Sequence, residues 1–146
     1  MDRVSMRRCD SDVVVLMFLQ VTQVITISAD LSLEDQCVKT VERTLELLGG
    51  LDVLVNNAGY LAKESFTELS MQTIDESMAV NLKSAVKLSQ CALASLQRSG
   101  GSIVNVSSIA GLRAWPGALA YKMSKAAMDQ MTRCVALEVG DIYSYF

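Results

Sequence analysis

A tyrosine and a lysine, spaced four residues apart, are the side chains in this chain best suited to proton chemistry. Tyr121 and Lys125 stand in the run Y-K-M-S-K, and on a helix this spacing places both on one face. A phenol is a poor base near neutral pH because its ordinary pKa is about 10. A lysine ammonium beside it favours the phenolate. Such a pair can move a proton on or off an alcohol oxygen. The same spacing also fits an exposed helix that carries an unrelated aromatic residue.

A serine pair upstream could supply a second hydroxyl for the same chemistry. An apolar, β-branched run after a Gly-Gly turn predicts a strand over 102–107. Ser107 and Ser108 stand at its carboxyl end, the edge at which open α/β sheets bind ligands. The stretch between Ser108 and Tyr121 leaves room for a loop, and a hydroxyl at Ser108 could donate to a substrate oxygen. Capping of a strand or helix is the alternative function of these serines.

Amide and small residues follow another predicted strand. The short valine-rich run within 51–56 predicts a buried parallel strand, which ends in Asn56-Asn57-Ala58-Gly59. Small residues at such a strand end allow a ligand to approach the backbone closely, although an ordinary Asn-Gly-type turn is the alternative. Asn81 lies within a predicted helix over 70–97 and is flanked by apolar residues. It is either a tolerated polar helix residue or a functional one.

With these elements in this order, the chain resembles the short-chain dehydrogenase/reductase family over about residues 24–138. The matching motifs are N-N-A-G at 56–59, Asn81, Ser108 and Y-K-M-S-K at 121–125. The run A-D-L-S at 29–32 is similar to the acidic segment that follows the family's third strand. Within the family, the chain looks similar to the 3-oxoacyl-acyl-carrier-protein reductases.

The resemblance implies a role for each matching residue. Tyr121 would be the general acid/base, Lys125 would favour its phenolate and bind the nicotinamide ribose, and Ser108 would hold the substrate oxygen. Asn81 would anchor a water molecule in a proton relay. The residues implied to bind the cofactor are Asp30, Leu31, Asn57, Ala58, Gly59, Tyr121 and Lys125. The implied reaction is hydride transfer between NAD or NADP and a small carbonyl/alcohol substrate.

Two parts of the family pattern are not found in the sequence. Family members open with a strand and a G-x-x-x-G-x-G turn, which binds the cofactor pyrophosphate at a helix N-terminus. The first glycine of this chain is Gly49. After a predicted helix over about 119–138 only residues 139–146 remain, and we expect the family's next strand to be missing. The sequence therefore predicts a single incomplete domain over residues 1–146, truncated at both ends, with residues 1–23 unmatched.

The order of elements predicts an α/β fold: a partial doubly wound parallel sheet of Rossmann type in three α/β/α layers. We expect one or two strands within 13–29, a helix over 33–48, and then the strands and helices given above. Ser32 and Asp35 predict a capping box at the start of the first helix, and Gly49 predicts its end. The loop containing Trp115 and Pro116 is expected to shape the substrate pocket, or else to be a plain surface loop.

The composition narrows the possible functions. A chain with 51% hydrophobic and 20% charged residues is expected to fold, and its net charge of −3 offers no basic surface for nucleic acid. The absence of histidine excludes Ser-His-Asp and Cys-His mechanisms, and we expect no metal site. Four cysteines without metal-ligand spacing predict free thiols and a cytoplasmic location. The apolar run at 13–19 is too short to span a membrane.

Two functions remain open from the sequence. The first is an NAD(P)-dependent oxidoreductase, present here whole or as a fragment that lacks the glycine-rich pyrophosphate loop. The second is a non-catalytic chain of the same fold that binds partner subunits through the helices at 70–97 and 119–138, since the family commonly associates through these helices. The resemblance also implies that the complete form is a homo-oligomer.

Overall fold

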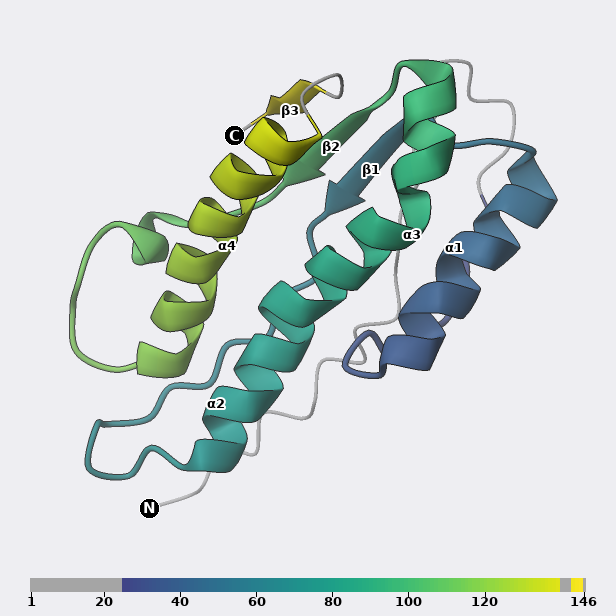
Figure 1. Cartoon of the computed structure of the whole chain (residues 1–146). Coiled ribbons are helices and arrows are strands. Elements are labelled where there is room, and N and C mark those ends of the chain that lie inside the picture. Colours follow the sequence, from purple (N-terminus) through teal and green to yellow (C-terminus); the bar gives the residue numbers. More distant parts are fainter. Residues whose placement is uncertain (1–24, 140–142, 146) are drawn as a thin grey trace.

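The structure, a computed structural model, describes residues 25–139 and 143–145, in which helices alternate with short strands (Figure 1). The helices are α1 (Glu34–Leu48), α2 (Met71–Met78), α3 (Ser84–Ser99) and α4 (Leu119–Glu138). A π-helical segment, η1 (Ala79–Lys83), joins α2 to α3, and a 3₁₀ turn, η2 (Ile109–Gly111), precedes α4. The strands are β1 (Val53–Asn56), β2 (Ser102–Asn105) and β3 (Tyr143–Tyr145).

The strands form a parallel sheet in the order β1-β2-β3. Val53 pairs with Ser102 and Asn56 with Asn105, so the carboxyl ends of β1 and β2 lie level. Ser102 also pairs with Tyr143 in the third strand. Residues that follow β1 and β2 therefore leave the sheet at the same edge, which is the edge that the sequence predicts for ligands.

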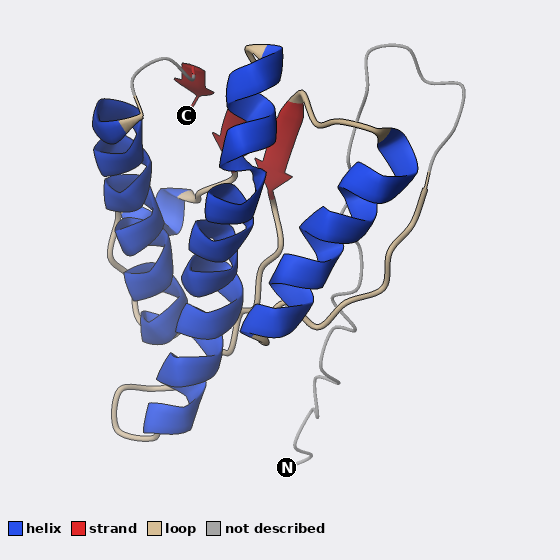
Figure 2. Ribbon diagram, turned by 45° about the vertical axis from the view of Figure 1, so that its right-hand side comes forward, coloured by secondary structure: helices blue, strands red, loops and turns tan. Residues whose placement is uncertain are grey.

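The described helices pack on one face of this sheet, as both views show (Figures 1 and 2). The burial of the strands alternates accordingly: Leu54 and Ile103 are buried, whereas Val53 and Val104 on the other face are only half-buried. Leu88, Leu96 and Cys37 from the helices complete a single apolar core around the buried strand residues. The expected α/β class with a parallel sheet is confirmed, and the described residues supply the sheet together with one helical layer.

Two predictions about strands are wrong in the described residues. Residues 25–29 form no strand and pair with no described strand; a segment becomes a strand only when its backbone groups bond to a neighbour. The rest of the predicted strand region, 13–24, lies outside the described residues. Conversely, a strand follows α4 where we expected none: β3 pairs with β2 and continues the sheet. β1 and β2 are also shorter than the predicted 51–56 and 102–107.

The start of α1 corrects a third prediction. The N-cap of α1 is Leu33, which has no side chain that could cap the helix. Ser32 instead donates hydrogen bonds from its N–H and its hydroxyl to Asp30 Oδ1, at 3.0 and 2.6 Å, and Asp35 pairs with Lys39 at 2.8 Å. The capping box is therefore wrong, because the nearby Asp30 carboxylate is the acceptor that Ser32 reaches. The predicted end at Gly49 is confirmed by its left-handed conformation (φ 76°).

A close backbone approach at the start of β2 yields a test of the fold. A Cβ atom on Gly101 would lie 2.2 Å from the carbonyl oxygen of Asp52, which accepts a hydrogen bond from Ser102 N–H. We predict that Gly101→Ala lowers the free energy of unfolding by about 1–3 kcal/mol or more, because the β1–β2 pairing must shift to admit the methyl group. Gly50→Ala is the matched control, since nothing lies within 4 Å of its Cβ position. Urea denaturation in which both variants lose the same stability would contradict this account.

Candidate functional site

Tyr121 and Lys125 lie in the first two turns of α4, as the sequence predicts for a helical pair. The Lys125 ammonium nitrogen is 5.8 Å from the centre of the Tyr121 ring. Lys125 is 3% exposed, and its Nζ donates a hydrogen bond of 2.7 Å to the carbonyl oxygen of Val106 and a weak one of 3.9 Å to Met128 Sδ. Because Val106 directly follows β2, the lysine joins α4 to the carboxyl edge of the sheet.

Burial affects the charge of Lys125. Removal of the ammonium from water lowers the pKa of Lys125 below its ordinary value, and the nearby Asp129 carboxylate opposes this by raising it. The lysine therefore holds its proton less tightly than an exposed lysine does. A group of this kind, buried beside a phenol, is typical of a proton-handling site.

Ser108 lies just beyond β2 and caps the turn η2. Its Oγ accepts a hydrogen bond of 3.1 Å from Ala110 N–H, so the predicted capping role is observed for this serine. The turn packs directly on α4: a Cβ atom on Gly111 would lie 3.0 Å from the backbone carbon of Lys125 and 2.8 Å from Asp129 Oδ2. Gly111, which sequence reasoning did not identify, therefore permits the turn that Ser108 caps to pack closely on α4.

Asn81 is fully buried in η1 and uses its side-chain amide to join separate segments. Its Oδ1 accepts from Tyr60 N–H at 2.6 Å, and its Nδ2 donates to the Tyr60 carbonyl at 2.9 Å. Nδ2 also lies 2.8 Å from Ser124 Oγ and 3.2 Å from Ser77 Oγ. Ser124 in turn donates to the carbonyl of Tyr121 at 2.7 Å. The amide thus connects the loop after β1 to the helix that carries Tyr121 and Lys125.

The N-N-A-G run divides between the core and the surface. Asn56 is buried and donates to Asn105 Oδ1 at 2.8 Å and to Ser89 Oγ at 3.2 Å, so its amide group ties β1 to β2 and α3. Asn57 and Gly59 are exposed, and Ala58 is half-buried against the core. The exposed positions follow the carboxyl end of β1, and nothing beyond ordinary contact crowds the Cβ position of Gly59.

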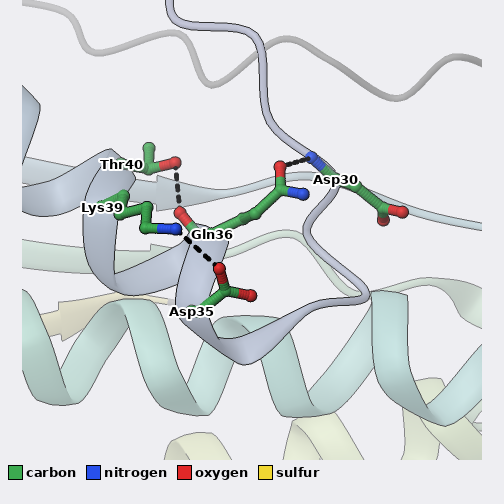
Figure 3. Close-up of polar contacts among 5 residues, drawn as sticks. All are labelled: Asp30, Asp35, Gln36, Lys39 and Thr40. Atoms are coloured by element: carbon green, nitrogen blue, oxygen red, sulfur yellow. Dashed lines mark hydrogen bonds and ion pairs between the residues drawn. The ribbon is translucent and has the colours of Figure 1, made fainter.

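Asp30 and Leu31 precede α1 and are positioned by that helix. Asp30 N–H donates to Gln36 Oε1 at 2.6 Å, and Gln36 in turn accepts at its carbonyl from Thr40 Oγ1 at 2.8 Å. The Asp30 carboxylate points away from Gln36 (Figure 3). Leu31 is 4% exposed and belongs to the core. A cavity of about 530 Å³ opens between the start of α1 and the segment η1–α3, and Leu31 is the one predicted site residue in its lining.

Sequence reasoning missed three residues that build the site. Ser124, Gly111 and Tyr60 position the predicted residues through contacts between elements distant in sequence. Ser124 could have been identified from the sequence, because it lies inside the Y-K-M-S-K run and is a small polar residue that helices often bury. Tyr60 contributes its backbone N–H and C=O, so the identity of its side chain could not indicate this role.

In the described ranges, 25–139 and 143–145, no group of histidine, cysteine or acidic side chains has a metal-binding arrangement. No helix in these ranges is long and apolar enough to cross a membrane. Cys37 is a buried free thiol, Cys91 is half-buried and Cys134 is exposed. Cys9 lies outside the described residues.

Comparison with known proteins finds a matching family model and oxidoreductases of similar sequence. A family model for short chain dehydrogenase matches residues 13–142. An "uncharacterized oxidoreductase" of Thermotoga maritima is 43% identical over 102 residues, which are 69% of this chain and 41% of that protein. Carbonyl reductase (NADPH) 2 of Sus scrofa is 38% identical over 70% of this chain and 43% of its own length. The chain thus spans less than half the length of these relatives.

A solved structure shares the fold. The alcohol dehydrogenase of the archaeon Thermococcus sibiricus, complexed with 5-hydroxy-NADP, superposes with a TM-score of 0.77 at 28% identity. The match covers 80% of this chain and 50% of the alcohol dehydrogenase.

The lowered pKa of Lys125 predicts how stability depends on pH. Between its folded-state pKa and the ordinary value of 10.5, the unfolded chain binds more protons than the folded chain, so the free energy of unfolding rises with pH. In Lys125→Met, the pH-dependent contribution of the lysine to the free energy of unfolding is absent. We predict that the stability of the wild type relative to Lys125→Met increases as the pH rises through the lowered pKa of Lys125 towards 10.5, as measured by urea denaturation. The exposed Lys63→Met should show no such trend, and a flat difference for Lys125→Met would contradict the assignment.

Proposed function

Since the chain belongs to the short-chain dehydrogenase family, we propose that its site handles the proton in a reversible hydride transfer between a nicotinamide and a carbonyl/alcohol pair. The observation that carries this proposal is the setting of Lys125. It is a buried ammonium, bonded to the edge of the sheet and one turn from Tyr121 on the same helix. Ser108 lies on a turn packed against that helix.

Each residue has a proposed role in carbonyl reduction. Tyr121 gives its phenolic proton to the substrate oxygen as that oxygen gains negative charge, and in oxidation it takes the proton back. Lys125 stabilises the phenolate that remains. Ser108 donates a hydrogen bond to the same substrate oxygen, as an oxyanion donor does. Asn81 holds the helix in place through Ser124, and we retain its proposed part in a proton relay.

The donors present fit the nicotinamide end of the cofactor. A lysine ammonium has three donors, and among the described oxygen and nitrogen atoms only the Val106 carbonyl accepts from Lys125, which leaves capacity for a ribose hydroxyl. Asn57, Ala58 and Gly59 would line the cleft beside it, and Asp30 with Leu31 would contact the adenine end. When bound, the nicotinamide supplies or accepts the hydride. The proposal covers both NAD and NADP.

The proposed enzyme is the whole protein that the gene encodes. Residues 1–146 form part or all of one Rossmann-type domain of that protein. Its substrate would be a small carbonyl or alcohol compound. The alternative proposal is a non-catalytic chain that binds a partner subunit through α2, α3 and α4, in a homo-oligomer or with another chain. The exposure of Met71 and Leu137 on these helices, 70% and 87%, favours some contact there. Activity that depends on Tyr121 would decide between the two functions.

The lack of a glycine-rich turn predicts weak cofactor binding by the 146-residue chain. Backbone N–H groups at a helix N-terminus hold a pyrophosphate in such folds, and no glycine precedes Gly49. We expect dissociation constants for NADH and NADPH well above the micromolar range, measured by nicotinamide fluorescence. Submicromolar binding to this chain would show that another segment replaces the turn.

The acid/base role of Tyr121 predicts the effect of single substitutions in the protein as its gene encodes it. Tyr121→Phe should abolish ketone reduction and leave cofactor binding intact, because the ring remains while the proton donor is lost. Ser108→Ala should weaken transition-state stabilisation by roughly 2.7–4 kcal/mol, the effect of one lost oxyanion donor. Lys125→Ala should impair both turnover and cofactor binding.

The control for these substitutions is Ser65→Ala, which removes a hydroxyl from an exposed loop. Turnover should be measured with a panel of small ketones and 3-oxoacyl thioesters, alongside a cofactor titration of each variant. Near wild-type turnover in Tyr121→Phe would refute the assigned acid/base.

A further inference from the structure

Lys122, the residue after the proposed acid/base, has a buried ammonium with an unusual set of partners. It is 9% exposed and lies in the first turn of α4. Its Nζ donates hydrogen bonds to the carbonyl oxygens of Trp115 and Gly117, the latter at 2.6 Å. The same nitrogen lies 4.2 Å from the centre of the Trp115 ring, a cation–π distance. None of the ion pairs among the described side chains includes Lys122.

The position of the Lys122 ammonium is unfavourable for a charged group. A cation in the first turn of a helix meets the positive end of the helix dipole and is disfavoured there. Burial adds the loss of hydration. Both penalties are offset only if the ammonium is held by the Trp115 and Gly117 carbonyl groups and by the Trp115 ring. Lys122 and the loop that carries these groups therefore stabilise each other.

The loop held by Lys122 is also strained. Gly117 has φ 73° and Ala118 has φ 60°, so two successive residues adopt the left-handed conformation, and one of them carries a side chain. Ala118 is 8% exposed and is the N-cap of α4, without a side-chain capping bond. A non-glycine residue persists in this conformation only where its surroundings fix it. The bond from Lys122 to the Gly117 carbonyl lies directly at this turn.

The two ends of the loop explain why its position matters. Residues 112–118 run from η2, which Ser108 caps, to α4, which begins two residues before Tyr121 (Figure 1). We propose that Lys122 is a positioning residue: it holds the loop 112–118 on α4 and thereby fixes the wall beside the two hydroxyls that would bind the substrate oxygen. This role rests on the proposed function, whereas the anchoring of the loop does not.

The anchor can be tested without any enzymatic assay, because Trp115 is the only tryptophan of the chain. In Lys122→Met we expect a shifted Trp115 emission and stronger acrylamide quenching. We also expect faster cleavage after Arg113 by an arginine-specific protease, by about tenfold, as the loop opens more often. Lys122→Arg, which keeps the charge and donors, should restore most of the wild-type emission. Lys63→Met, on an exposed loop, should change neither reading.

Unchanged emission and cleavage in Lys122→Met would overturn the anchor. If that variant does not fold, amine labelling of the wild type takes its place: Lys122 should react much more slowly than the exposed Lys63 and Lys83, and rapid labelling would overturn the proposal.

The positioning role is tested in the protein as its gene encodes it. There, Lys122→Met should raise KM for carbonyl substrates several-fold with little change in kcat, and Lys122→Arg should reverse the effect. A fall in kcat at constant KM would overturn the positioning role and leave the loop anchor standing. If the wild type itself turns over no substrate, the proposed function fails, while the fluorescence and proteolysis results still decide whether Lys122 holds the loop.

Discussion

The site depends on one buried amide, that of Asn81. Three segments meet at this side chain: the loop after β1, the π-helical segment η1 and the helix α4. An amide has two donor hydrogens and one acceptor oxygen, and here both the oxygen and the nitrogen are engaged while the residue is fully buried. Loss of the Asn81 side chain would remove the hydrogen bonds that hold the half-buried backbone of Tyr60, and a typical intramolecular hydrogen bond contributes about 0.5–1.5 kcal/mol to stability. The relative position of loop and helix is therefore set by hydrogen bonding more than by apolar packing.

The same principle extends along the carboxyl edge of the sheet. Asn56 and Asn105 face each other across β1 and β2, and Asn105 donates to Thr132 on α4 at 2.9 Å. Lys125 bonds to the carbonyl of Val106 at this edge. Buried polar groups in a core are costly unless they are paired, so such a layer fixes one arrangement of the helices on the sheet. A precise arrangement of this kind is what positions Tyr121 and Ser108, both of which are half-buried.

The sequence predicted those features that local patterns encode. The order of elements from α1 to α4, the helical Y-x-x-x-K pair and the end of α1 at Gly49 all follow from periodicity, spacing or the special conformation of glycine. The π-helical segment around Asn81 was not predicted, because within 70–97 the apolar pattern of the chain is that of a continuous helix. The contacts of Lys122 and Gly111 depend on a loop folding back onto α4, and no short-range pattern specifies them. β3 was missed because three residues carry too little pattern to identify a strand.

These contacts also separate two properties that an oxidoreductase of this family combines. The hydrogen bonds described above for Asn81, Ser124 and Lys125 join segments within residues 60–128. Binding of a pyrophosphate, in contrast, requires backbone donors at a glycine-rich turn, and this chain has no glycine before residue 49. The geometry for proton transfer therefore does not depend on the cradle for the phosphates. Under the proposed function, substitutions around Asn81 or Lys122 should therefore alter the position of Tyr121 or the substrate pocket more than they alter contacts with the cofactor phosphates.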